Sequence, residues 1–400
     1  MTLQIGVLGY RFMGKAHANA LDRLPMFFPD APETNRDVLI GRDEDALSEA
    51  AERLGFDRIS TDWEDVVEDV DVFYNLGPNF VHAEPSIAAL EAGTHVFCEK
   101  PLAATLDDAE AMAAAAAESD AVAGTAFNYR FVPAIRYAKR LIDAGELGEI
   151  HHVRGRYLQD WLVDPEAPWS WRNDEELAGS GALGDLGAHT IDLVQFLVGD
   201  VERLSGQLRT FVDERPVEGK ENETKPVTVD DAYSAQAELE GGAMATLEAT
   251  RFATGHKNDH TIEIQGSEGS LKFSLERLNE LEVMTGDNRG YETVLVTDPD
   301  DPYVDHWWPP GHVIGWEHTF VHENYEFLSA IAASETPERS GGDSDAQRAS
   351  TDSSGPDPRE VAAENRQGTG FQPSFQDGLS VQRVLAAVEE SDERGEWVEL

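Results

Sequence analysis

The chain has few cysteines and few basic residues. Cys98 is the only cysteine among 400 residues, which excludes an internal disulfide and a cysteine-based metal site. Lys and Arg number 31 against 77 Asp and Glu, so the net charge is −46. Because like charges repel, we expect no binding to nucleic acid or to an anionic membrane.

Long apolar runs are also absent. Runs of small apolar residues such as 112–117 are far shorter than a membrane span, and the first residues show a strand pattern rather than a signal peptide. We therefore expect a soluble protein of the reducing cytoplasm. Acidic residues occur in nearly every segment, which favours adaptation of the whole surface to concentrated salt, as in a halophile.

What the first 127 residues do contain is an alternation of short apolar runs and longer helical patterns. The runs predict strands at 3–8, 37–42, 72–76, 95–98 and 121–126, and the patterns predict helices at 13–24, 44–54, 82–92 and 106–119. This order is typical of an α/β fold, a doubly wound parallel sheet of the Rossmann type. We expect residues 1–127 to form an NAD(P)-binding domain.

The pattern changes in residues 128–400. Helices are expected at 132–144, 184–198, 317–333 and 377–391, and strands at 150–157, 201–211, 232–239, 244–251, 261–266, 270–274, 281–284 and 292–296. This order predicts a second, α+β domain for substrate binding and oligomerisation, with a large, mostly antiparallel open sheet. Residues 334–372 are nearly all small, polar or charged, which predicts a disordered surface insertion.

A turn with two glycines follows the first predicted strand. Gly9 permits a tight turn and Gly14 a close approach of helix and strand, with Phe12 and Met13 between them. Arg11 replaces the middle glycine of the G-x-G-x-x-G pattern. Taken alone, the turn therefore leaves a phosphate-binding role and an accidental pair of glycines equally open.

The end of the second predicted strand bears on the choice of cofactor. Gly41 leaves room there, and the planar guanidinium of Arg42 matches a 2′-phosphate, which Arg11 could help to hold. These residues predict NADP. Two alternatives stay open, since Arg42 could pair with Asp43 or Glu44 on the surface, and Asp43 could bind a ribose hydroxyl of NAD.

Two further segments carry chemistry. Glu99, Lys100 and Pro101 end a predicted strand, so Lys100 is expected at the carboxyl edge of the sheet, where ligands of such folds bind. Asp185 and His189 lie four residues apart and would share one face of a helix.

Taken together, these motifs resemble the Gfo/Idh/MocA family, which includes glucose–fructose oxidoreductase and inositol dehydrogenases. The resemblance covers nearly the whole chain and includes the Pro78-Asn79-Phe80-Val81-His82 turn, Glu99-Lys100-Pro101, Asn128-Tyr129-Arg130, Trp171-Arg172 and the glycine-rich run before Asp185 and His189. Arg11 and the insertion at 334–372 depart from the family pattern.

The resemblance implies a reacting centre of Lys100, Asp185 and His189. His189 suits the base that takes the hydroxyl proton, and Asp185 would orient the imidazole or the substrate hydroxyl and stabilise the cation that forms. Lys100 would hydrogen-bond the substrate oxygen and oppose its developing negative charge. We expect cofactor contacts from Gly9, Arg11, Phe12, Met13, Gly14, Gly41, Arg42, Pro78, Asn79, His82 and Glu99. Substrate contacts are expected from Asn128, Tyr129, Arg130, Tyr157, Asp160, Trp161, Trp171 and Arg172.

The expected function is NADP-dependent hydride transfer to or from a hydroxyl-bearing carbon of a sugar, sugar acid or cyclitol. A non-catalytic NAD(P)-binding regulator of the same fold and a nicotinamide-dependent glycosidase are the alternatives. The resemblance also implies a homodimer or homotetramer. His318 and His322 lie four apart without an accompanying ligand motif, so no metal site is expected.

Overall fold

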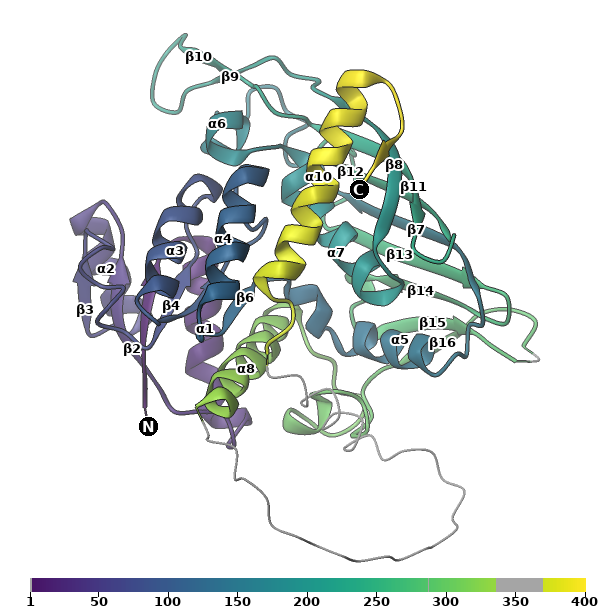
Figure 1. The fold of residues 1–400 in the computed structure, drawn as a ribbon, viewed down its shortest axis with the longest axis horizontal. Coiled ribbons are helices and arrows are strands. Elements are labelled where there is room, and N and C mark those ends of the chain that lie inside the picture. Colours follow the sequence, from purple (N-terminus) through teal and green to yellow (C-terminus); the bar gives the residue numbers. More distant parts are fainter. Residues whose placement is uncertain (1, 287, 336–369) are drawn as a thin grey trace, which may run out of the picture.

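A computed structural model describes residues 2–286, 288–335 and 370–400. Two sheets lie side by side in it, a smaller one at the N-terminal end and a larger one built from the middle of the chain, with helix α10 between them (Figure 1). Most of the predicted insertion, residues 336–369, lies outside the described part of the chain.

The first sheet has six parallel strands in the order β3-β2-β1-β4-β5-β6. Their bounds are β1 Leu3–Leu8, β2 Thr34–Ile40, β3 Arg58–Ser60, β4 Val72–Asn75, β5 His95–Cys98 and β6 Ala123–Thr125. The chain order reverses between β1 and β4, which opens a crevice at the carboxyl ends of these strands. The predicted Rossmann sheet is confirmed.

Capping side chains mark the start of two of the helices in this half. The helices are α1 Phe12–Phe27, α2 Glu44–Leu54, η1 Asn79–Val81, α3 Ala83–Glu91 and α4 Leu106–Glu118. The Asp43 side chain caps the start of α2, and Gly55 ends it in the left-handed conformation at φ 75°. The Thr105 side chain caps α4 in the same way. The predicted strand 37–42 stops at Ile40, so Gly41 and Arg42 lie in the loop beyond the sheet edge.

The second sheet has nine strands in the order β16-β15-β14-β13-β7-β12-β11-β8-β17. Only the β7–β12 pair is parallel among its described pairs, so the predicted mostly antiparallel sheet is confirmed. The strands are β7 Ile150–Leu158, β8 Val201–Arg209, β11 Ala232–Leu239, β12 Met244–Thr250, β13 Asp259–Gly266, β14 Ser270–Ser274, β15 Glu280–Met284, β16 Glu292–Leu295 and β17 Val398–Glu399, with a separate hairpin of β9 Glu214–Pro216 and β10 Thr224–Pro226.

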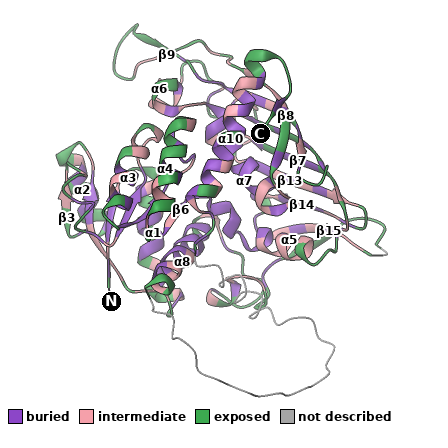
Figure 2. Cartoon of the chain, viewed as in Figure 1, coloured by how far each residue is buried: buried purple, intermediate pink, exposed green. Residues whose placement is uncertain are grey.

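One face of the second sheet is packed and the other is open. Buried and exposed residues alternate along β12, as expected for a strand with one wet face. The packed face lies against α5 Pro133–Asp143, α7 Ala188–Leu197 and α10 Phe375–Arg394, whose inward sides are buried (Figure 2).

The last two long helices return to the first sheet. Helix α8, Trp316–Ser334, packs along α1, and α10 contacts both α4 and β8. The remaining short helices are η2 Asn128–Phe131, η3 Trp171–Asn173, α6 Glu175–Ala178, η4 Leu183–Gly187, η5 Leu275–Arg277 and η6 Val304–His306. The two sheets are therefore joined by packed helices as well as by the chain between them.

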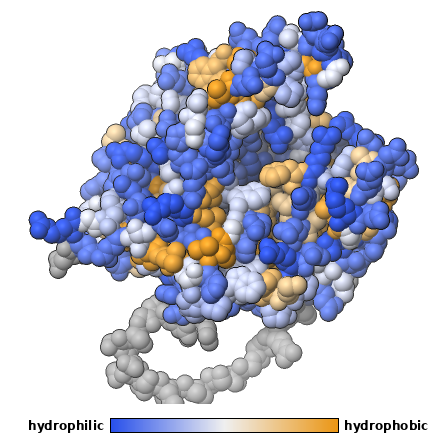
Figure 3. All heavy atoms as spheres, turned by 180° about the vertical axis from the view of Figure 1, so that it is seen from behind, coloured by the Kyte–Doolittle hydropathy of each residue, from blue (hydrophilic) through white to orange (hydrophobic). Residues whose placement is uncertain are grey.

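The face of the molecule seen in Figure 3 is largely hydrophilic, with a few hydrophobic patches. No helix in the described ranges is both long and apolar enough to cross a bilayer.

Candidate active site

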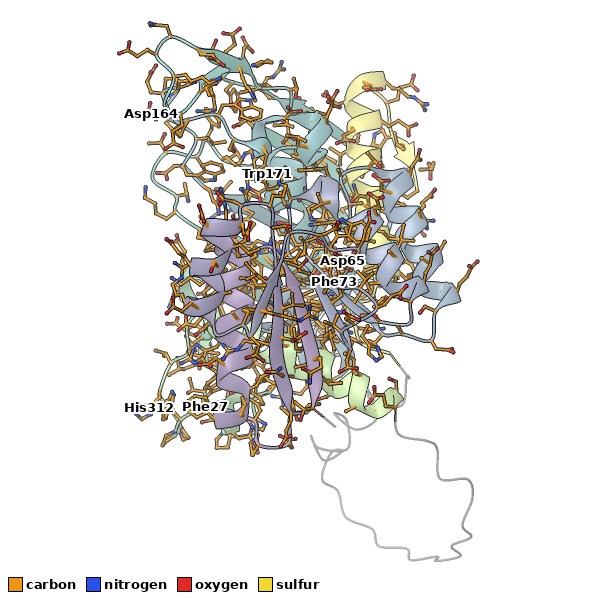
Figure 4. All side chains as sticks on the ribbon, turned by 90° about the vertical axis from the view of Figure 1, so that its left-hand side faces the viewer. Phe27, Asp65, Phe73, Asp164, Trp171 and His312 are labelled. Carbon is orange, nitrogen blue, oxygen red and sulfur yellow. The ribbon has the colours of Figure 1, made fainter. Side chains whose placement is uncertain are left out.

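One cavity of about 1600 Å³ begins at the carboxyl edge of the first sheet and extends to the second. Residues of both halves line it, including Trp171, which lies beyond one end of the first sheet, whereas Phe27 lies at the opposite end (Figure 4). The topology predicts a ligand at this edge, and the cavity is large enough to hold a dinucleotide together with a small substrate.

The turn after β1 has the shape of a phosphate-binding turn. Gly9 has φ 107°, and a Cβ atom there would lie 2.6 Å from the Leu76 carbonyl oxygen. A Cβ atom on Gly14 would lie 2.1 Å from the Gly9 carbonyl oxygen, so both positions require glycine. Gly14 does not line the cavity; it brings α1 against the turn.

The start of α1 opens into the cavity. Arg11, Phe12 and Met13 line it there, and the first turn of the helix holds no acidic residue. A helix N-terminus with free backbone N–H groups attracts phosphate, and Arg11 adds a positive charge where the family pattern has glycine. These residues fit the pyrophosphate of a dinucleotide.

The loop after β2 lines the same end of the cavity. A Cβ atom on Gly41 would lie 2.5 Å from the Tyr10 ring, so glycine lets that ring pack against the loop. No ion pair involves Arg42 within the described part of the chain, which removes the alternative of a pair with Asp43 or Glu44 from this conformation. The Asp43 carboxylate instead accepts a hydrogen bond from the Ala46 N–H at 3.1 Å.

Two of the three predicted cofactor residues after β4 line the cavity, and the third does not. Pro78 and Asn79 line the cavity, and the Asn79 amide donates to the Ala178 carbonyl at 2.8 Å. His82 does not line the cavity, contrary to the prediction. Its buried ring lies 3.1 Å from the Pro101 carbonyl oxygen and 3.0 Å from that of Gly77, so it ties together two loops that do line the cavity.

Lys100 and Asp185 meet across the two halves of the molecule. The Lys100 ammonium donates to the Asp185 carbonyl oxygen at 2.6 Å and lies 3.6 Å from its carboxylate. Burial raises the pKa of Asp185, but the charges of Lys100, Arg172 and Arg251 outweigh it, so the pKa lies below its ordinary value. Asp185 is therefore ionised at neutral pH.

A π-helical turn precedes α7 and places Asp185 ahead of His189. Residues Leu183–Gly187 form this turn, which widens the helix where both side chains face the cavity. Burial first, then the charge of Lys100 and the neighbouring His260, hold the pKa of His189 well below 6.5. The imidazole is thus neutral near pH 7 and available as a proton acceptor, and its buried Nδ1 has no hydrogen-bond partner among the described residues.

A wall of aromatic and amide side chains faces His189. The Tyr129 ring lies 4.5 Å from the imidazole between centroids, and its hydroxyl lies 2.9 Å from that of Tyr157. Tyr157 in turn donates to Asn258 Oδ1 at 2.7 Å. The cavity is also lined by predicted residues Asn128, Trp161, Trp171 and Arg172, and by Gln159, Arg251, Asn258 and Trp316, which the sequence motifs did not reveal.

Arg130 does not line the cavity, so its predicted contact with substrate is wrong. Its buried guanidinium forms a two-pronged pair with Asp192, with closest distances of 2.7 and 2.9 Å, and lies 3.2 Å from Asp377. A buried guanidinium is costly without hydrogen-bond acceptors, and here carboxylates of α7 and α10 supply them. Arg130 therefore fastens η2 to two helices.

Replacing Arg130 by methionine should destabilise the protein without changing the shape of the cavity. Burial, which the Arg130 charge only partly offsets, already raises the pKa of Asp192 to about 6, and its carboxylate would lose its main partner. We expect a loss of about 3–5 kcal/mol in the free energy of unfolding, measured by urea denaturation at neutral pH. Arg154→Met, which breaks an exposed pair with Glu263, is the control and should cost far less. Equal losses in the two variants would contradict a structural role for Arg130.

Asp160 is also outside the cavity lining, contrary to its prediction. It accepts hydrogen bonds from the Lys257 ammonium at 2.7 Å and from the Gly255 N–H at 3.0 Å. The carboxylate thus closes the turn between β12 and β13 instead of contacting a substrate.

The two spaced histidines of α8 have partners within the fold. His322 Nε2 accepts from the Trp307 indole at 2.8 Å, and its Nδ1 lies 2.9 Å from the Phe131 carbonyl oxygen. The Gly315 N–H donates to His318 Nδ1 at 3.1 Å. Among the residues described, no group of three or more His, Cys, Asp or Glu is arranged to hold a metal ion.

A glycine turn at the switch point of a parallel sheet, with an ammonium, a carboxylate and a neutral imidazole lining the same cavity, is typical of a nicotinamide-dependent dehydrogenase. Residues 3–127 match the family model described as "Oxidoreductase family, NAD-binding Rossmann fold", and residues 135–272 match "GFO/IDH/MocA C-terminal domain". The chain belongs to the Gfo/Idh/MocA family of oxidoreductases.

Similar proteins match over the full chain. Levoglucosan dehydrogenase of Pseudarthrobacter phenanthrenivorans is 38% identical, with 100% of this chain and 98% of the relative covered. An oxidoreductase domain protein from Kribbella flavida has a solved structure that is 47% identical, with a TM-score of 0.87 and coverage of 100% and 99%. A levoglucosan dehydrogenase solved with NADH and levoglucosan is 37% identical, with a TM-score of 0.88 and the same coverage.

Proposed function

We propose that the protein transfers a hydride between a nicotinamide dinucleotide and a hydroxyl-bearing carbon of a sugar, anhydrosugar or cyclitol. The observation that carries the proposal is the meeting of Lys100, Asp185 and His189 in the one cavity that also contains the glycine turn. The full-length similarity to a levoglucosan dehydrogenase supports a sugar-like substrate.

Each of the three side chains has a distinct task in this proposal. When bound, the nicotinamide ring accepts the hydride during alcohol oxidation or supplies it in the reverse direction. His189 takes the hydroxyl proton, because its neutral imidazole can accept it at neutral pH. Lys100 donates a hydrogen bond to the substrate oxygen, and Asp185 holds the ammonium and offsets its charge.

The walls of the cavity suit a polyol. Tyr129, Tyr157, Gln159 and Asn258 present hydroxyl and amide groups that can exchange hydrogen bonds with sugar hydroxyls. Trp161 and Trp171 offer flat apolar faces that match the C–H faces of a sugar ring.

The test is an activity screen at high salt with both NAD and NADP. Levoglucosan, aldoses, uronates and inositols form the substrate panel, and reduction of the cofactor is followed by its absorbance. High salt is included because a surface with a net charge of −46 repels itself when unscreened. Cofactor reduction with at least one of these compounds supports the proposal. Tight cofactor binding with no turnover of any compound would instead indicate a regulator, and cleavage of aryl glycosides without net cofactor reduction would indicate a glycosidase.

We further propose that NADP is the preferred cofactor, because Arg42 lines the cavity without an ion-pair partner in the described chain and Asp43 already caps α2. Arg42→Ala should raise the dissociation constant for NADP about 10–100-fold, the usual effect of losing a charge-assisted hydrogen bond. The constant for NAD should change little. Arg53→Ala, in the last turn of α2, is the matched control. An equal effect of Arg42→Ala on both cofactors would contradict a 2′-phosphate contact, and preference of the wild type for NAD would contradict the choice of NADP.

A further inference from the structure

A chain of buried hydrogen bonds runs from the centre of the molecule to the cavity. The Tyr74 hydroxyl of β4 donates to Asn324 Oδ1 of α8 at 2.8 Å, and Asn324 Nδ2 lies 3.1 Å from His17 Nδ1 of α1. His17 Nε2 lies 3.3 Å from Glu99 Oε1 at the end of β5. Tyr74, Asn324 and His17 are fully buried, and none of the three lines the cavity, whereas Glu99 does.

The partners fix the direction of every hydrogen bond in this chain. Asn324 Oδ1 accepts from Tyr74, and Asn324 Nδ2 donates to the Phe320 carbonyl at 2.7 Å. The atom that lies next to His17 Nδ1 is therefore the amide nitrogen, which donates its second N–H. His17 Nδ1 must therefore be the acceptor, which leaves the ring proton on Nε2. The neutral imidazole donates this proton to Glu99.

The surroundings hold the imidazole in this orientation. The rings of Tyr74, Phe97 and Phe320 meet the His17 ring edge-on, with centroids 5.3 to 5.7 Å apart. Burial raises the pKa of the Tyr74 hydroxyl well above 10, so the hydroxyl at the far end keeps its proton and remains a donor.

Glu99 is the last member of this series of hydrogen bonds. Besides His17, the Lys100 N–H donates to it at 3.2 Å. The other titratable groups that face it are Glu323 from α8, His82 from the loop after β4, and Cys98 and the Lys100 ammonium from its own segment. Glu323 has no hydrogen-bond partner in the described chain, although its Oε1 lies 4.0 Å from His17 Nε2. Burial, followed by repulsion from Glu99, raises the pKa of Glu323 well above 4.5 and so favours its neutral form.

We propose that His17, Asn324 and Tyr74 are positioning residues that act through Glu99 to stabilise the oxidised cofactor over the reduced one. This inference rests on the proposed function, since hydride transfer beside Lys100 requires the nicotinamide ring at the Glu99 end of the cavity. The oxidised ring is a cation and the reduced ring is neutral. A Glu99 carboxylate held in place by the His17 and Lys100 N–H donors therefore attracts the oxidised form alone.

The experiment measures dissociation constants of oxidised and reduced cofactor for the full-length protein at high salt, by quenching of protein fluorescence and by fluorescence of the reduced cofactor. His17→Leu removes the side-chain donor to Glu99. We expect the dissociation constant of the oxidised cofactor, divided by that of the reduced cofactor, to rise about tenfold, the typical effect of one hydrogen bond to a charged group. Tyr74→Phe removes only the far hydroxyl and should raise the ratio by a smaller factor. Because the Tyr74 change deletes a single atom, it also serves if the His17 variant fails to fold.

Glu323→Gln is the matched control. Burial and repulsion from Glu99 favour the neutral carboxyl, so an amide of the same size should leave the ratio unchanged. An unchanged ratio in both His17→Leu and Tyr74→Phe, with cofactor still bound, would overturn this inference alone. A shift in Glu323→Gln as large as that in His17→Leu would also overturn it, because the charge would then not reside on Glu99. Failure of the wild type to bind any dinucleotide would overturn the proposed function together with this inference.

Discussion

Replacing His189 by alanine should lower kcat for alcohol oxidation about 10²–10⁴-fold, the range that a positioned general base contributes. The imidazole lies against the Tyr129 ring and within the electrostatic influence of Lys100, and its lowered pKa leaves it free to accept a proton. The dissociation constant of the cofactor should hardly change, because the glycine turn and the Arg42 loop belong to the first sheet, whereas His189 belongs to a helix packed on the second. Steady-state kinetics together with a cofactor titration measure both effects.

His312→Ala is the matched control for this variant, since that histidine is exposed and far from the cavity. The pH profile gives a second check on His189. Because the pKa of His189 is held below 6.5, kcat/KM of the wild type should stay level as the pH falls to about 6.5 and should decline only below it. Turnover near the wild-type level in His189→Ala would remove this residue as the base.

Replacing Lys100 by methionine should lower kcat about 10²–10³-fold, the usual effect of losing one preorganised donor to a developing negative charge. Methionine fills similar space without the ammonium, so the loop after β5 should keep its packing. The change should also raise the pKa of Asp185, because the Lys100 charge is the largest of the effects that lower it. We therefore expect a new dependence of the residual activity on protonation of Asp185.

Lys139→Met is the control for the Lys100 variant, since Lys139 forms a partly exposed pair with Asp143 within α5. It should leave kcat and KM unchanged. If Lys100→Met weakened substrate binding and left kcat intact, Lys100 would serve in ground-state binding only, which would contradict charge stabilisation in the transition state.

Much of the fold could be predicted because its signals are local. The apolar runs that form β1, β4 and β5 are bounded by turns, and the helices between them show period and caps. Strand β3 was missed because Arg58–Ser60 is a three-residue edge strand without a buried position. The π-helical turn at Leu183–Gly187 was missed because a widened turn has no distinct periodicity over so short a stretch.

Site residues that belong to a continuous sequence motif were predicted, whereas those that only the fold brings to the cavity were missed. Lys100 follows directly from the end of a strand. Asn258 lies in the loop before β13 and Trp316 is the first residue of α8, so only the fold brings them to the cavity. Errors at Arg130 and Asp160 have the same origin. Their partners Asp192 and Lys257 lie 62 and 97 positions further along the chain, and only the fold reveals that these charges are already satisfied.

Helix α8 has a consequence for how this chain can be divided. It runs along α1 of the first sheet, and Tyr325 and Asn324 reach Asp30 and Tyr74 there, although more than half of the chain separates them. A fragment cut after residue 127 would leave the buried face of α1 bare, so we expect it to aggregate when expressed alone. Exchange of nucleotide-binding halves between relatives should therefore succeed only when α8 is exchanged with them.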